Sequence, residues 1–156
     1  MMTTTDRKDI RQLRMPELKQ LIEEMGEKKF RARQIHEWLW QKGARSFEEM
    51  TNLSKELRER LQERFVINAI TEDAVQHSLD GTIKSRFRLH DGYLIESVLI
   101  PVPDDKRFTV CVSSQVGCSL SCKFCATGRM KRERNLDAAE IFDQVVMVNQ
   151  QCEEAF

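Results

Sequence analysis

The chain has 156 residues with 25 Lys+Arg against 25 Asp+Glu, so its formal net charge is zero, and 40% of its residues are hydrophobic. This composition suits one domain of about 100–150 residues or two smaller ones, and the zero charge excludes a uniformly basic coat for nucleic acid while leaving local patches open. No apolar run approaches the ~18–20 residues of a membrane span, and residues 1–14 lack the apolar core of a secretory signal, so we expect no membrane association.

The amino-terminal part, roughly the first 65 residues, is predicted to be helical. Pro16 suits a first helical position, apolar residues follow at helical spacing, and Gly26 is placed to end that helix. A second helix is expected over residues 31–41 with Trp38 on its buried face, and Ser54 is placed to cap a third.

Beyond residue 65 the apolar period changes to two, which is typical of strands. Residues 83–89 alternate between apolar and polar and are bracketed by Asp-Gly turn dipeptides, and further strands are expected over 93–100 and 108–113. They form a small antiparallel unit, or the third strand starts a new sheet.

A loop over residues 116–134 leads into a helix at about 137–151. Asp137 and Glu140 are spaced like a capping box, and we expect Ile141, Val145 and Val148 to share the buried face. The order strand, loop, helix is the first half of a βα repeat, which cannot close a parallel sheet alone. We therefore expect the sequence to be the amino-terminal part of a longer enzyme.

The cysteines all lie in the last third of the chain, at positions 111, 118, 122, 125 and 152. An odd, clustered set favours reduced thiols in a cytoplasmic setting, used for metal or redox chemistry. The spacing C-x3-C-x2-C of Cys118, Cys122 and Cys125 suits three irons of a [4Fe–4S] cluster. A zinc site, which normally needs a fourth protein ligand, and a thioredoxin-like Cys122–Cys125 pair are the alternatives.

The longer stretch from Cys111-Val-Ser-Ser-Gln-Val-Gly-Cys118 through Cys122-Lys-Phe-Cys125-Ala-Thr-Gly resembles the RlmN/Cfr family of radical S-adenosylmethionine RNA methyltransferases. The segments at residues 30–40, 80–83 and 95–101 and the Asn135-Leu pair are similar to that family as well. The resemblance covers nearly the whole chain from about Asp9.

This resemblance implies an α/β fold in three regions. Residues 1–70 would be a small helical accessory domain of helix-hairpin-helix type that binds RNA. Residues 71–104 would be a β-hairpin linker, and residues 105–156 the first βα unit of a partial (β/α)6 barrel with its cluster loop.

The resemblance also implies an enzyme that methylates C2 of an adenosine in 23S rRNA and of the adenosine 3′ of the tRNA anticodon. Cfr-type members methylate C8 of the ribosomal adenosine instead. The implied cofactors are a [4Fe–4S] cluster and S-adenosylmethionine, reduced by a donor such as a flavodoxin, in a monomeric enzyme. A zinc-stabilised RNA-binding module without catalysis is the rival from another class.

Individual roles carry over by position. The three clustered cysteines would bind the metal, and Phe124 would lie near S-adenosylmethionine or simply pack the loop. Glu96 would be the proton acceptor, or else a solvent-facing strand carboxylate. Cys111 would form a transient disulfide with a methyl-carrying cysteine that has no counterpart here, or else be a buried strand thiol; Cys152 is expected to be an ordinary helix residue.

Two basic groups are candidate RNA contacts. The first group is a stretch of sequence with six cations and a single carboxylate, Glu37, and aromatic residues are interleaved among the cations. Its cations are Lys28, Lys29, Arg31, Arg33, Lys42 and Arg45. The second group follows the cysteines and comprises Arg129, Lys131, Arg132 and Arg134. A solvated helix face with a Trp core, and an exposed loop, are the respective alternatives.

Overall fold

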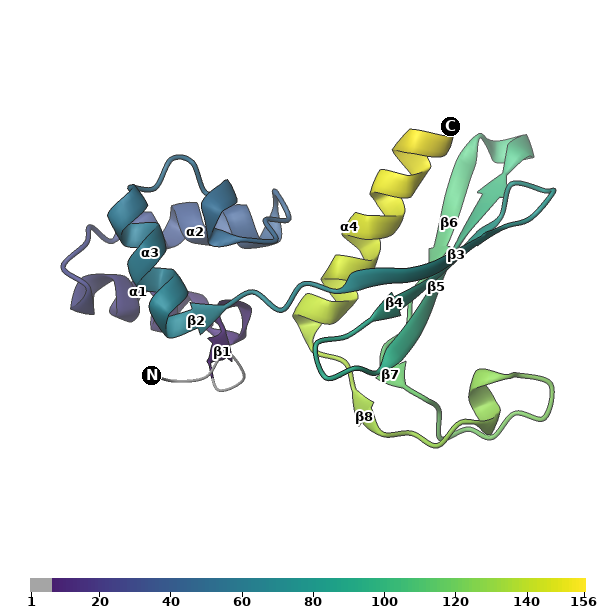
Figure 1. The fold of residues 1–156 in the computed structure, drawn as a ribbon. Coiled ribbons are helices and arrows are strands. Elements are labelled where there is room, and N and C mark those ends of the chain that lie inside the picture. The colour runs from purple at the N-terminus through teal and green to yellow at the C-terminus, as the bar shows by residue number, and fades with distance from the viewer. Residues whose placement is uncertain (1–6) are drawn as a thin grey trace. The chain divides into compact units, whose positions relative to one another are not determined.

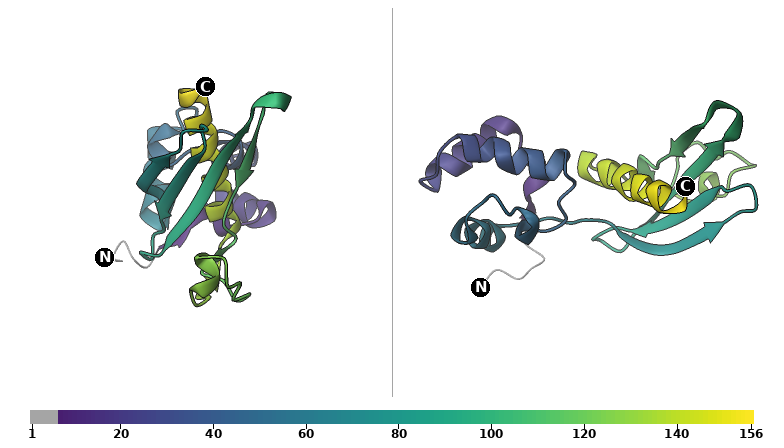
Figure 2. Two further views of the ribbon diagram at one scale, coloured as in Figure 1. Left: turned by 90° about the vertical axis from the view of Figure 1, so that its right-hand side faces the viewer. Right: turned by 90° about the horizontal axis from the view of Figure 1, so that it is seen from above.

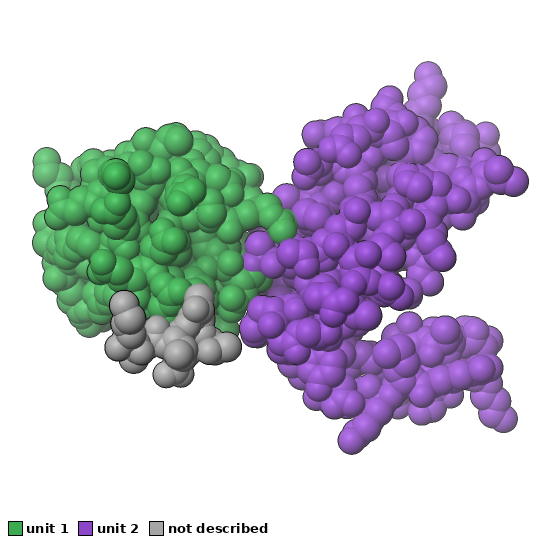
Figure 3. Space-filling view, viewed as in Figure 1, with its two compact units in different colours: residues 1–68 green, residues 69–156 purple. Residues whose placement is uncertain are grey.

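The computed structural model describes residues 7–156, and the chain divides into two compact units, residues 1–68 and 69–156 (Figure 1 and Figure 3). Within the described residues, no helix combines the length and apolar character that crossing a membrane requires. The first unit is helical and the second combines a sheet with one long helix. The second unit therefore contains both the predicted hairpin region and the predicted start of the barrel.

The first unit packs three helices around one apolar core. Two short strands, one from before the first helix and one from after the last, pair in parallel. Its elements are β1 (Lys8–Asp9), α1 (Met15–Glu24), α2 (Phe30–Trp40), α3 (Lys55–Arg64) and β2 (Phe65–Val66), with 3-10 turns at Ile10–Gln12 and Phe47–Glu49.

Local sequence signals explain where these helices begin and end. Pro16 lies in the first turn of α1, and Gly26 follows that helix with φ +74°, a conformation that glycine adopts without strain. The Ser54 hydroxyl accepts the backbone N–H of Leu57 at 3.2 Å, which confirms the predicted cap of α3. Trp38 is only half-buried, because its indole N–H donates to Asn52 Oδ1 at 2.6 Å near the surface.

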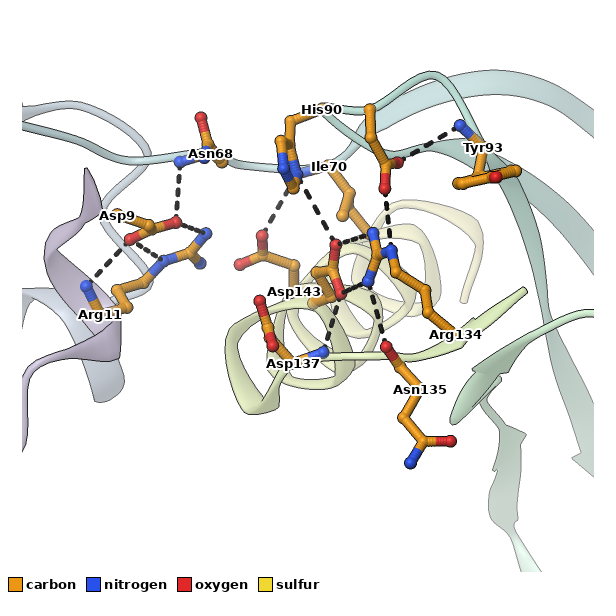
Figure 4. A network of polar contacts seen from close by, with 12 residues as sticks. Asp9, Arg11, Asn68, Ile70, His90, Tyr93, Arg134, Asn135, Asp137 and Asp143 are labelled. Atoms are coloured by element: carbon orange, nitrogen blue, oxygen red, sulfur yellow. Dashed lines mark hydrogen bonds and ion pairs between the residues drawn. The ribbon is translucent and has the colours of Figure 1, made fainter. Parts of the chain in front are cut away.

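A buried carboxylate ties the two ends of the first unit together. Asp9 accepts hydrogen bonds from the Arg11 backbone and guanidinium, the shortest at 2.9 Å, and from the backbone N–H of Asn68 at 3.0 Å (Figure 4). The Asp9 and Arg11 side chains are only 7% and 2% exposed. Mutual pairing offsets the cost of burying both charges.

The second unit is a four-stranded antiparallel sheet in the order β3-β4-β5-β6, with α4 lying against one face (Figure 1 and Figure 2). The antiparallel alternative for the third predicted strand is therefore confirmed. Its elements are β3 (Thr71–His77), β4 (Ile83–Arg88), β5 (Leu94–Val102), β6 (Arg107–Cys111), β7 (Gln115–Val116), β8 (Arg134–Asn135) and α4 (Ala138–Ala155), with 3-10 turns at Pro103–Asp105 and Thr127–Arg129.

Two features of this sheet differ from expectation. Strand β3 was not predicted, because Thr71–His77 is an edge strand of mostly polar residues without apolar alternation. Strand β5 continues through Pro101 to Val102, beyond the expected end at residue 100; Pro101 lies opposite Phe108 near the end of the ladder, where loss of one N–H is tolerated.

The face that α4 turns to the sheet is more polar than predicted. Val148 is buried as expected, but Val145 is 46% exposed and Gln144 is completely buried. The predicted face was therefore wrong at Val145. The apolar period alone could not reveal a buried amide whose partners are supplied by distant strands.

Gln144 satisfies its whole side-chain amide inside the second unit. Its Oε1 accepts from the Ser97 hydroxyl at 2.8 Å and the Ser113 backbone N–H at 2.7 Å. Its Nε2 donates to the carbonyl oxygens of Ser113 at 2.8 Å and Glu140 at 3.2 Å. The Ser113 hydroxyl in turn donates to the Glu96 carbonyl at 2.7 Å. One amide therefore joins the helix, strand β5 and the segment that follows β6.

We predict that Gln144→Leu lowers the free energy of unfolding by on the order of 3 kcal/mol, because it removes the partners of the buried Ser97 hydroxyl and of the partly buried Ser113 backbone N–H and carbonyl. Urea unfolding followed by circular dichroism measures the change. Asn149→Ala on the same helix is the control, since Asn149 is exposed and its side chain donates to the exposed Glu153 at 3.2 Å. Equal losses in the two variants would contradict the role assigned to Gln144.

Candidate active site

The two faces of the sheet carry different chemistry because side chains alternate along each strand. Ile83, Phe87 and Leu99 lie on the face that packs against α4. The intervening residues point to the opposite face, which we call the open face. The open face carries the charged residues of β4 and β5, and both predicted catalytic residues of the sheet belong to it.

Strand register brings Glu96 and Cys111 together on the open face. Cys111 on β6 lies directly opposite Val98 on β5, two residues from Glu96. Diagonal neighbours of this kind have Cα atoms about 7–8 Å apart. Cys111 is exposed, so the alternative of a buried strand thiol is wrong.

Glu96 is held by a neighbouring cation. Its carboxylate lies 3.0 Å from the ammonium of Lys84 on β4, and the two side chains are 44% and 46% exposed. The carboxylate is therefore oriented on the open face while it remains accessible to a ligand.

A hollow of about 280 Å³ lies between the open face and the loop that contains the cysteines. Both the strand residues and the loop residues contribute to its wall. The lining residues are Lys84, Arg86, Leu94, Ile95, Glu96, Ser113, Gln115, Gly117, Ala126, Thr127 and Met130. The hollow thus joins the predicted proton acceptor to the predicted metal-binding segment.

The cysteine loop is closed at its base and extends beyond the end of the sheet (Figure 1 and Figure 2). Strands β7 and β8 pair across the base. Gly117 has φ +71°, and a Cβ there would collide with the Lys131 carbonyl, so the loop can close only with glycine at this position. In the space-filling view the loop forms a separate lobe of the second unit (Figure 3).

The three cysteines of the motif are half-buried free thiols. The Cys118 sulfur accepts a hydrogen bond from the Leu120 backbone N–H at 3.4 Å, and the Cys125 N–H donates to the Cys122 carbonyl at 3.1 Å. Three accessible thiols on one short loop fit the donor set of an iron–sulfur cluster. Among residues 7–156, however, no three metal-binding side chains converge closely enough to hold an ion.

The aromatic residue of the motif points into solvent. Phe124 is 93% exposed and its neighbour Leu120 is 78% exposed. The alternative that Phe124 packs the interior of the loop is therefore wrong. Its nearness to S-adenosylmethionine stays a prediction.

Arg134 anchors the carboxyl end of the loop. Its guanidinium binds both oxygens of Glu140, each at 2.8 Å, and Asp91 in the β4–β5 turn at 2.8 Å (Figure 4). Glu140 also accepts the Asp137 N–H at 2.8 Å, which completes the predicted capping box of α4. The hydrogen bonds that Arg134 donates, chiefly those to Glu140, raise the pKa of Arg134 further above its usual range.

Arg134, one of the predicted RNA contacts, has a structural role, because its charge is already paired with the carboxylates of Asp91 and Glu140. Arg132 donates to Asn135 Oδ1 at 3.0 Å, and Arg129 donates to the Lys123 carbonyl at 3.2 Å; both remain exposed, as does Lys131. The loop cations other than Arg134 are therefore accessible to a ligand.

The cations of the first unit are mostly engaged with neighbours. Lys29 lies 2.7 Å from Glu23, which raises the pKa of Lys29, and Arg33 lies 3.2 Å from Glu37. Arg31 donates to Gln34 and the Asn52 carbonyl and stacks over Phe30. Lys42 lies 3.9 Å from the centre of the Trp38 ring. Lys28 is exposed.

Comparison with solved structures defines the class of protein. A crystal structure of a radical SAM methyltransferase from Sphaerobacter thermophilus matches with a TM-score of 0.79 and 42% sequence identity, over 95% of this chain and 43% of that one. The fold described above is thus that of the corresponding part of a radical SAM methyltransferase.

Sequence comparison gives the family. Residues 8–67 match the family model of the ribosomal RNA large subunit methyltransferase N-terminal domain. A "Probable dual-specificity RNA methyltransferase RlmN" from Cytophaga hutchinsonii is 57% identical over 99% of this chain and 42% of its own length. A "Dual-specificity RNA methyltransferase RlmN" from Geotalea uraniireducens is 49% identical over 92% and 41%. The chain belongs to the RlmN family and spans about two fifths of the length of these relatives.

We predict that the anchor of the loop weakens in acid. Burial opposes ionisation of Asp91, but the hydrogen bond and charge of Arg134 outweigh it and lower the pKa of Asp91. A lowered folded-state pKa contributes stability above the unfolded value of about 4, and this stability is lost as pH falls through the folded value. The stability difference between the unsubstituted chain and Asp91→Asn should therefore shrink below about pH 4.

Urea unfolding at a series of pH values from neutral to acidic tests this dependence. Asp105→Asn is the matched control, since Asp105 forms an exposed pair with Arg107 away from the loop. If the difference in unfolding free energy between the unsubstituted chain and Asp91→Asn stays constant with pH, the prediction is wrong.

Proposed function

We propose that this chain forms part of a radical S-adenosylmethionine methyltransferase that modifies C2 of an adenosine in 23S rRNA and of the adenosine 3′ of the tRNA anticodon. The observation that carries the proposal is the open face, where Glu96 and Cys111 lie diagonally across two strands beside a hollow that reaches the cysteine loop. The RNA methyltransferase names of the relatives support the substrate class.

Cys118, Cys122 and Cys125 would hold three irons of a [4Fe–4S] cluster, with S-adenosylmethionine at the open iron and Phe124 beside it. When bound and reduced by a donor such as a flavodoxin, this pair supplies radical chemistry for methyl transfer. The loop supports the assignment because its thiols are accessible and one sulfur already accepts a backbone N–H.

The strand residues then act on the adenine. Glu96 accepts the proton that C2 must lose for aromaticity to return, and Lys84 holds the Glu96 carboxylate in place. The Cys111 thiolate would attack the sulfur of a second cysteine, the methyl-carrying one, which is linked to the adenine through its methylene carbon. The S–S bond forms as the S–C bond breaks, and the carbon keeps the electron pair and takes up a proton to give the methylated product. The exposure of Cys111 on the same face allows the second cysteine to approach.

RNA is the proposed partner of both units. Residues 1–70 would be the accessory RNA-binding domain, with exposed Lys28 among its contacts, and the loop cations would meet phosphates at the mouth of the hollow. We place the enzyme in the cytoplasm as a monomer. Methylation at C8 by the same residues is the nearest alternative outcome.

Anaerobic reconstitution with iron and sulfide, in a protein that has the full length of the relatives, tests the cluster. We expect about 4 Fe per chain, with loss of most of the iron in Cys122→Ala. Cys152→Ala is the control, because Cys152 lies on α4, away from the loop. Stoichiometric zinc without iron uptake would instead support a zinc-stabilised RNA-binding module.

The base is tested in a protein that has the full length of the relatives. We expect Glu96→Gln to stall turnover at an RNA-linked adduct, because the amide cannot accept the proton, with product formation reduced by about a hundredfold or more. Gel mobility and mass spectrometry of the RNA measure the adduct. Lys84→Gln serves as a comparison that keeps the carboxylate, and free product from Glu96→Gln at the unsubstituted rate would exclude the base.

A further inference from the structure

Strand β4 carries three cations whose role the sequence did not reveal. Lys84, Arg86 and Arg88 alternate with buried residues and so lie on the open face. Lys84 is paired with Glu96. The two arginines lie two residues apart, which places their Cα atoms about 7 Å from each other.

One carboxylate holds both arginines. A bulge between Glu72 and Ala74 makes Asp73 the extra residue of β3. The Asp73 carboxylate accepts from Arg86 Nε at 2.6 Å and from Arg88 Nη2 at 2.5 Å. Arg88 first, and then Arg86, lower the pKa of Asp73, so this carboxylate is ionised at neutral pH.

The arrangement leaves most of each guanidinium free to bind a ligand. The Asp73 side chain is only 15% exposed, whereas Arg86 and Arg88 are 49% and 52% exposed. Arginine has five N–H donors, and each of these two gives one to Asp73. Two guanidiniums and one carboxylate also leave a net positive charge. The guanidinium of each arginine is therefore oriented before a ligand binds. This orientation lowers the entropic cost of ordering the two side chains when an anion binds.

We propose that Arg86 and Arg88, oriented by Asp73, bind consecutive phosphates of RNA that runs along the open face into the hollow beside Glu96. Arg86 itself lines that hollow. Planar bidentate donors match phosphate geometry, and a polynucleotide presents a phosphate at every residue. The proposal rests on the proposed function, because it takes RNA as the substrate.

Fluorescence anisotropy with a labelled RNA hairpin, whose loop contains an adenosine, tests the proposal at about 50 to 200 mM salt. We expect Arg86→Gln and Arg88→Gln each to weaken binding about threefold to tenfold and to reduce the salt slope by about 0.7–0.9. Arg86→Lys keeps the charge but not the fork and should bind with intermediate affinity. Arg107→Gln is the matched control, since Arg107 pairs with one carboxylate, Asp105, in the same sheet.

The outcomes separate this inference from the proposed function. If the unsubstituted chain binds the hairpin but both glutamine variants keep its affinity and slope, the arginines do not bind phosphate and the proposed function stands. An equal loss in Arg107→Gln would show a general charge effect and would also overturn the inference. Failure of the unsubstituted chain to bind RNA would overturn both. Thermal unfolding of each variant confirms that it is folded.

Discussion

The second unit depends on one buried amide. Gln144 makes four hydrogen bonds, two of them with the backbone N–H and carbonyl of Ser113, and the Ser113 hydroxyl donates to the carbonyl of Glu96. Because Gln144 and Ser97 are buried and Ser113 is partly buried, losing one partner leaves others unsatisfied. Gln144, on the helix that covers one face of the sheet, therefore holds the segment between β6 and the cysteine loop in place through Ser113. The positions of Glu96 and Cys111 on the open face are set by strand register and by the alternation of side chains.

The cysteine loop combines a closed base with an exposed tip. Arg134 and Glu140 join its carboxyl end to α4, and the β7–β8 pair closes its base. Beyond this base the tip exposes Phe124 and Leu120, and its thiols do not converge. Such a loop suits a cofactor whose binding free energy completes the local fold.

The alternation of strands explains how one sheet serves both stability and chemistry. The residues of β4 and β5 that face α4 form the core, and the residues between them present a carboxylate and three cations on the other face, to which β6 adds the Cys111 thiol. The Asp73 bulge is a local departure from this regularity. At the bulge, the Asp73 carboxylate accepts hydrogen bonds from Arg86 and Arg88 and so orients both guanidiniums on the open face.

The sequence by itself determined the helices of the first unit, the caps at Ser54 and Asp137, and the family, because these depend on neighbours close along the chain or on a contiguous cysteine motif. It did not reveal β3, the burial of Gln144 or the role of Arg134. Only the tertiary structure decided these, since each depends on partners supplied by distant segments. The same holds for the site. The family-like sequence segments identified Glu96 and Cys111 as candidates, whereas strand register decided that they are diagonal neighbours on the face opposite α4.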